Sequence, residues 1–220
     1  MVVFSTSFET HLKKTYTRIK KLKIFKRCLR QGVLNPPLLL AVFFPSFRYA
    51  EEAFTRLREI SSDIRLSLQP RFSSVAEANG FLAMALSGSN ALFLVLGSVF
   101  SEGIDVLGGQ VDTAMIVSPA LPEVNPLQEA KMQAMSTMGR KEAFRRTYLI
   151  PGMRKVNQAL GRLVRVPGHR ARVLLHCRRF AEPVYRELLD PVCRDVSVLQ
   201  SPEEMLAWLT TEENSVALPS

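Results

Sequence analysis

The sequence is poor in cysteine and histidine. Its three cysteines, Cys28, Cys177 and Cys193, lie far apart and form no C-x-x-C pair. The three histidines do not complete a set of metal ligands with them, so we expect no zinc or iron–sulfur site made by this chain alone. Few, scattered cysteines are typical of a reducing, cytoplasmic setting.

Long hydrophobic runs are also missing. The longest apolar runs cover residues 37–44 and 91–96. Both are far shorter than the roughly 20 residues that cross a bilayer, and the first residues lack the basic-then-apolar pattern of a secretion signal. The sequence therefore predicts a soluble, intracellular protein with no membrane-spanning segment.

Two features needed to hold a nucleoside triphosphate are missing as well. The sequence has no G-x-x-x-x-G-K-[ST] loop, since no Gly-Lys dipeptide occurs, and no predicted strand ends in Asp-Glu. That loop cradles phosphates, and the acidic residue after a strand holds Mg²⁺. We therefore expect no complete nucleotide-hydrolysing site within these 220 residues.

What the sequence has in excess is positive charge, gathered in two segments. It carries 29 Lys and Arg against 20 Asp and Glu, a net charge of +9. Residues 1–31 and 139–179 together hold 21 of these cations and two acidic residues. Such segregation predicts a polyanion or nucleotide partner, although two solvated basic faces would give the same counts.

Short apolar runs alternate with helical patterns, which predicts an α/β fold with a parallel sheet covered on both faces. We expect a basic N-terminal segment (1–37), one domain (38–214) and a loose tail (215–220). The expected strands cover 38–44, 64–68, 91–98, 113–118, 171–177 and 196–199. The expected helices cover 48–60, 73–87, a segment from about 126, 151–165, 182–189 and, after a cap at Ser201, 202–212. Ligands of such sheets bind at the carboxyl ends of the strands.

The stretch NQALGRLVR, residues 157–165, places two arginines and a glutamine in an apolar run. On a helix over 151–165, a turn of about 100° per residue brings Gln158, Arg162 and Arg165 to one face, beside Gly161. Two guanidiniums and an amide form an array of donors suited to phosphate oxygens. An ordinary amphipathic helix would show the same spacing.

Four stretches resemble motifs of the XPD/DinG family of superfamily-two DNA helicases, in that family's order. The resemblance implies a RecA-like three-layer sandwich with a mainly parallel sheet, the carboxyl-terminal motor half of an ATP-dependent helicase of DNA repair. The stretches are VFFPSF (42–47), FSEGIDVLGG (100–109), SPALPEVNPLQEAKM (118–132), and QALGRLVR (158–165) followed by ARVLLHCRRF (171–180).

The resemblance also implies roles for particular residues. Arg162 and Arg165 would be arginine fingers on ATP, Gln158 would place the γ-phosphate or the attacking water, and Gly161 would allow the two motor domains to pack closely. The residues implied to link nucleotide state to DNA grip are Glu102, Gly103 and Asp105. The implied nucleic-acid contacts are Ser46, Arg48, Ser98 and Ser101. Without the resemblance, Ser46 reads as a helix cap and Asp105 as a turn cap.

By the same resemblance, ATP would be shared with a first motor domain, in cis or in trans, that also holds Mg²⁺. The partner nucleic acid would be single-stranded DNA, and this chain alone would neither hydrolyse ATP nor unwind DNA. The chain departs from the family at Cys177, where an acidic residue is usual. The alternatives are a stand-alone nucleic-acid-binding module, a nucleotide-dependent enzyme on a doubly wound fold, and a non-functional helicase remnant.

Overall fold

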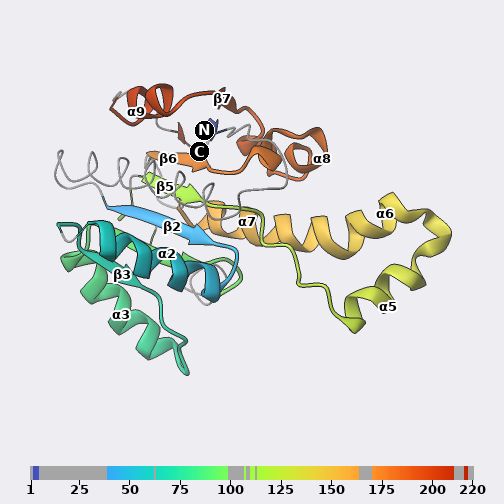
Figure 1. The fold of residues 1–220 in the computed structure, drawn as a ribbon, viewed down its shortest axis with the longest axis horizontal. Helices are drawn as coiled ribbons and strands as arrows, with labels where there is room; N and C mark the ends of the chain where they lie inside the picture. Colours follow the sequence, from blue (N-terminus) through green and yellow to red (C-terminus); the bar gives the residue numbers. More distant parts are fainter. Residues whose placement is uncertain are drawn as a thin grey trace.

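The apolar runs predicted to be strands form a sheet at the centre of the molecule (Figure 1). The computed structural model describes residues 2–4, 39–61, 63–98, 107, 110–111, 113–163, 170–210 and 216–217. Within these residues eight strands pair in the order β3-β4-β2-β5-β6-β1-β7, and β8 pairs with β6. All of these pairs are parallel except β6 with β8. The strands are β1 (Val2–Phe4), β2 (Leu40–Phe44), β3 (Leu66–Leu68), β4 (Ala91–Val95), β5 (Thr113–Ile116), β6 (Arg170–Leu175), β7 (Ser197–Leu199) and β8 (Val216–Ala217).

Helices cover both faces of this sheet. Because side chains alternate along a strand, Ala41 and Phe43 of β2 enter one core while Val42 and Phe44 enter the other. Helices α3 (Val75–Gly88) and α7 (Ile150–Leu163) pack in the first core, and α2 (Phe47–Ile60) and α9 (Pro202–Thr210) pack in the second. The predicted three-layer α/β sandwich is confirmed.

Side-chain caps set where several of the helices begin. Ser46, Ser74, Asn125 and Ser201 each accept a hydrogen bond from the backbone N–H three residues further on, at 3.3, 3.2, 2.9 and 3.1 Å. These bonds satisfy N–H groups that the first helical turn leaves unpaired. The cap predicted at Ser201 is therefore confirmed, and α9 begins directly after it.

Between β5 and α7 the chain leaves the sheet as a projecting helical hairpin (Figure 1). This arm (residues 126–149) consists of α5 (Pro126–Ala134), a 3-10 turn η1 (Ser136–Met138), α6 (Arg140–Phe144) and a π-helical segment η2 (Arg145–Leu149). The predicted helix at 151–165 continues from α6 through η2 rather than starting at Pro151. Since proline has no N–H to donate to the preceding turn, the wider π segment just before it accommodates the missing bond.

Several predicted boundaries differ from the structure. The strand expected over 91–98 ends at Val95, because Gly97 has a positive φ of 76° and turns the chain. The helix expected over 182–189 is reduced to α8 (Pro183–Arg186), between the 3-10 turns η3 (Arg178–Ala181) and η4 (Pro191–Cys193). Two short strands lie where the sequence predicted a basic segment and a loose tail: β1 lies between β6 and β7, and β8 pairs with the start of β6.

Candidate functional site at the carboxyl edge of the sheet

The chain leaves β2 and β4 side by side at one edge of the sheet. The two strands are parallel and in register, with Phe44 opposite Val95, and the Leu96 N–H donates to the Phe44 carbonyl at 2.9 Å. The turns that follow, Pro45–Ser46 and Leu96–Ser98, are therefore neighbours. Two predicted nucleic-acid contacts, Ser46 and Ser98, lie at this edge and are both half-buried.

Ser46 is the N-cap of α2, as its simpler interpretation predicted. Its hydroxyl oxygen accepts from the Tyr49 N–H at 3.3 Å, and its carbonyl accepts from the Ala50 N–H at 3.1 Å. Arg48 lies in the first turn of the same helix with its side chain exposed to solvent. A cap uses only part of the hydrogen-bonding capacity of a hydroxyl, so Ser46 remains compatible with a second contact.

Gln69 holds the turn after β4 (Leu96–Ser98, here the β4 turn) in place, and it was not identified from the sequence. It follows β3, is 2% exposed, and its side-chain oxygen accepts from the Val95 N–H at 2.9 Å and from the Ser98 hydroxyl at 3.1 Å. Its own N–H donates to the Phe93 carbonyl at 2.8 Å. The one available signal was a polar residue directly after the apolar run IRLSL.

Lys155 of α7 lies against the glycine of this turn. A methyl group added to Gly97 would lie 2.8 Å from Cδ and Cε of Lys155 and 3.0 Å from its Nζ. The absence of a side chain at Gly97 is what leaves room for the lysine stem. Lys155 belongs to the basic segment 139–179, and the sequence patterns indicate no particular role for it.

The polar face of α7 lies opposite its core face and is partly exposed. Its core face consists of Gly152, Met153, Val156, Ala159, Leu160 and Leu163. Gln158 and Gly161 are exposed and Arg162 is half-buried. A side chain at Gly161 would meet nothing within 4 Å, so within the described residues this part of the helix surface is bare.

Five predicted site residues lie outside the described residues, because α7 is described as far as Leu163 and the β4 turn as far as Ser98. Their roles stay predictions. They are Arg165, Ser101, Glu102, Gly103 and Asp105.

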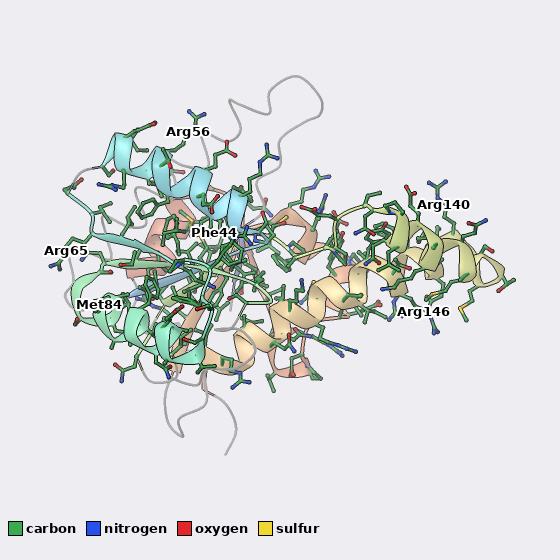
Figure 2. All side chains as sticks on the ribbon, turned by 90° about the horizontal axis from the view of Figure 1, so that it is seen from below. Phe44, Arg56, Arg65, Met84, Arg140 and Arg146 are labelled. Atoms are coloured by element: carbon green, nitrogen blue, oxygen red, sulfur yellow. The ribbon has the colours of Figure 1, made fainter. Side chains whose placement is uncertain are left out.

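The basic segment 139–179 does not form one surface. Arg140 and Arg146 lie on the arm (Figure 2), where Glu142 accepts from the Arg146 Nε at 2.7 Å. This bond is the main reason that the pKa of Glu142 is lowered. Lys155 and Arg162 lie instead on α7, which has no acidic residue. Of the two groups of cations, the one on α7 thus has no carboxylate partner within its own helix.

The donors along this flank of α7 suit an anion better than a metal ion. Gln158, Arg162 and Lys155 present amide, guanidinium and ammonium N–H groups, which bind phosphate oxygens. In the part of the chain that the structure describes, no three His, Cys, Asp or Glu side chains are placed to hold a metal ion. No described helix is long and apolar enough to span a bilayer.

Comparison with known proteins identifies the fold of the chain and its family. Residues 33–195 match the family model described as the helicase C-terminal domain. The sequence matches no curated protein. Among solved structures, apo XPD aligns over 91% of this chain with a TM-score of 0.68 and 16% identity, and XPD helicase aligns over 90% with a TM-score of 0.63 and 17% identity. Xpd4 of S. tokodaii aligns over 90% with a TM-score of 0.58 and 15% identity.

These structural matches confirm the predicted RecA-like architecture. The alignments cover 40%, 35% and 38% of the three XPD chains, so this chain spans well under half of their length. At these identities the likeness concerns the fold. The carboxyl-terminal domain of S. cerevisiae Dbp5 also aligns, over 94% of both chains, with a TM-score of 0.51 and 12% identity.

Proposed function

Since the chain belongs to the family of helicase C-terminal domains, we propose that it is the second motor domain of an ATP-dependent DNA helicase of the XPD/DinG type. In this role it supplies donors to an ATP whose phosphates and Mg²⁺ are held by a first motor domain, in cis or in trans. The observation that carries the proposal is the polar face of α7, where Gln158 and Arg162 flank a bare Gly161.

Arg162 is the described residue best suited to act on the γ-phosphate. A guanidinium offers paired N–H donors and keeps its charge at any working pH. Placed on the transferring phosphoryl group, such an arginine stabilises the charge of the transition state and is worth about 10³–10⁵ in rate. Arg165, three residues further on, is the second candidate. Gln158 orients the γ-phosphate or the attacking water.

The turns after β2 and β4 form part of the track for single-stranded DNA in this proposal. Ser46 and Arg48 follow β2, and Ser98 and Ser101 follow β4. Hydroxyl groups and arginine are common donors to phosphate oxygens of nucleic acids. The next residues along the chain link DNA binding at these turns to the state of the nucleotide. They are Glu102, Gly103 and Asp105.

ATP hydrolysis in the assembled protein tests the proposal. An immunoblot of the source material first shows whether the native polypeptide is larger than 24.7 kDa, and a pull-down identifies a partner carrying a phosphate loop. In the resulting assembly, Arg162→Ala should lower DNA-stimulated kcat by about 10³-fold or more. Arg65→Ala, which removes an exposed cation at the start of β3, should leave kcat unchanged.

Two results would contradict this function. One is an unchanged kcat in the Arg162→Ala assembly, provided that the variant still binds its partner domain. The other is DNA-stimulated ATPase activity of the purified 220-residue chain by itself, because it would place a complete phosphate site in a chain that has no phosphate loop.

A second candidate function is a stand-alone nucleic-acid-binding module, favoured by the net charge of +9. Binding through phosphates alone weakens steeply as salt is added. This function predicts salt-dependent binding of single-stranded DNA, no partner with a phosphate loop, and no specific role for Arg162. The pull-down therefore separates the two functions before any variant is made.

A further inference from the structure

The Lys155 side chain lies at the carboxyl edge of the sheet, against the turn that follows β4. Lys155 is half-buried, and its Cδ, Cε and Nζ lie over the Gly97 turn. Among the residues that the structure describes, it makes no hydrogen bond or ion pair. The lysine stem is thus packed against the turn, while no carboxylate of the described residues compensates the charge of its ammonium group. An anionic ligand would supply that compensation.

The direction of Lys155 matches that of Arg162. Seven residues separate them on α7, which is about two turns, so the two side chains leave the helix within about 20° of each other. Gln158 lies between them along the helix. The three residues form one row of donors along the flank of α7, with Lys155 at the end that lies against the β4 turn, and α7 contributes no acidic residue to the row.

The position of the Lys155 side chain depends on the absence of a side chain at Gly97. Gly97 has a φ of 76°, a conformation that other residues adopt at a cost. A side chain there would also overlap the lysine stem, at 2.8 Å from Cδ and Cε. The turn is itself held by Gln69 through Val95 and Ser98. The ammonium therefore lies against a fastened turn, two residues after the end of β4.

We propose that Lys155, held in place by Gly97, binds a phosphate group at the carboxyl edge of the sheet. The chemistry of the ligand is that of a phosphate oxygen, which a lysine binds as a compact point charge. Two sources supply such an oxygen in a helicase: the backbone of single-stranded DNA and the terminal phosphate of ATP. The choice of these two phosphate sources rests on the proposed function. The inference adds Lys155, and a phosphate site beside Gly97, to that function.

Binding by the 220-residue chain tests the inference without any ATPase assay. The first probe is a fluorescent dT12 oligonucleotide, whose affinity is measured against salt concentration. If Lys155 contacts a DNA phosphate, Lys155→Gln should weaken binding several-fold and reduce the slope of log K against log salt by about 0.7. Lys155→Arg should retain most of the binding.

Arg65→Gln is the matched control. It removes one charge from an exposed residue at the start of β3, whose N–H donates to Asn90 at 3.0 Å. It therefore lies at the amino edge, away from Gly97, and Figure 2 shows it at the opposite end of the molecule from the arm. Its salt slope should equal that of the unmodified chain.

The second probe is ATP with Mg²⁺. Its binding is detected as a shift of the Gly97 amide resonance in the ¹⁵N-labelled chain, and inorganic phosphate serves as a reference ligand. A Gly97 shift with ATP that Lys155→Gln abolishes, without a change in dT12 binding, assigns the site to the nucleotide. A change in dT12 binding alone assigns it to DNA. If Lys155→Gln behaves like Arg65→Gln with both probes, the proposal is overturned, because the ammonium group of Lys155 then binds neither phosphate ligand.

Gly97→Ala provides a second variant. It should displace the lysine and reduce phosphate binding as Lys155→Gln does, and its melting temperature shows whether the domain still folds. Failure of the proposed function would appear elsewhere, as an unchanged kcat of Arg162→Ala in the assembly. The two outcomes are therefore independent.

Discussion

Gly152 lies directly against the backbone of Leu121. A methyl group added to this glycine would lie 2.8 Å from Cδ2 of Leu121 and 3.1 Å from both its Cα and its backbone nitrogen. The contact joins the first turn of α7 to the segment that links β5 to the arm. It thus sets how close the helix with the candidate phosphate donors comes to the carboxyl edge of the sheet.

Gly152→Ala should destabilise the domain although alanine is the better helix former. Alanine gains about 1 kcal/mol over glycine inside an unhindered helix. Here the new methyl group must push the backbone of Leu121 away, and overpacking of a filled site costs about 1–3 kcal/mol. We expect a net loss of about 1 kcal/mol, measured as the free energy of unfolding in urea.

Gly161→Ala, in the same helix, is the matched comparison and should have the opposite sign. No atom lies within 4 Å of the position its methyl group would take, so the helix should gain up to about 1 kcal/mol. If the domain seam needs this glycine, the stabilised variant should bind its partner motor domain less well. Equal changes in unfolding free energy for the two variants would contradict the packing described for Gly152.

Ser46 allows its capping role to be separated from its proposed DNA contact. Ser46→Ala should cost about 1 kcal/mol of stability, because the Tyr49 N–H loses its acceptor. Ser46→Asn and Ser46→Asp should both retain the cap, and α2 has no acidic residue in its first turn to repel the aspartate.

Single-stranded DNA then discriminates between the two capping variants. If Ser46 faces the DNA backbone, Ser46→Asp should bind dT12 several-fold more weakly than Ser46→Asn at equal stability, because only the aspartate repels phosphate. Equal affinity of the two variants would leave Ser46 as a cap alone. Thermal unfolding and anisotropy on the same samples make both measurements.

The core of the fold was predictable because its strands are continuous apolar runs and its helices carry their own caps. β2, β4 and β5 fall within predicted strands, and β6 begins at Arg170, one residue before its predicted range. β1 was not predictable, since three residues pair with strands more than 160 positions away, and no local pattern encodes that partner. The helix expected from about 126 is α5, but the rest of the arm was missed because exposed Arg140, Lys141 and Arg146 hide the helical periodicity on which the prediction depends.

The candidate site was predictable in part. Gln158, Gly161 and Arg162 follow from helical spacing within one motif. Lys155 and Gln69 do not, since each acts through a residue of another element: Gly97 for the lysine, and Val95 and Ser98 for the glutamine. Contacts between elements are fixed by how the layers pack, and a single sequence does not state that packing.

Gln69→Leu should destabilise the domain and loosen the β4 turn. The leucine fills a similar buried volume but leaves the Val95 N–H without its 2.9 Å acceptor, and an unpaired buried donor costs about 1–3 kcal/mol. Ser98→Ala removes the 3.1 Å bond to the same oxygen but leaves the Val95 N–H with its acceptor, and should cost less. Hydrogen exchange should show a faster Val95 amide in Gln69→Leu alone; equally slow exchange in both variants would contradict this.

Cys193 should react slowly in the folded chain, where it is half-buried. Burial, together with the charge of Asp190, raises the pKa of the Cys193 thiol above its usual range near 8.5. Because the thiolate is the nucleophile, iodoacetamide should label Cys193 more slowly in the folded chain than in the denatured chain at pH 8, as measured by peptide mass spectrometry. Equal rates in the two states would contradict the raised pKa.

The same shift gives a pH dependence of stability with a definite sign. A folded-state pKa above the unfolded value means that the folded protein holds the proton more tightly, so this contribution to stability is fully present below about pH 8.5. It should be lost as pH rises through the folded-state pKa of Cys193. Cys193→Ala should therefore flatten the decline of the unfolding free energy as the pH rises above about 8.5, measured by urea unfolding at a series of pH values beside the unmodified chain.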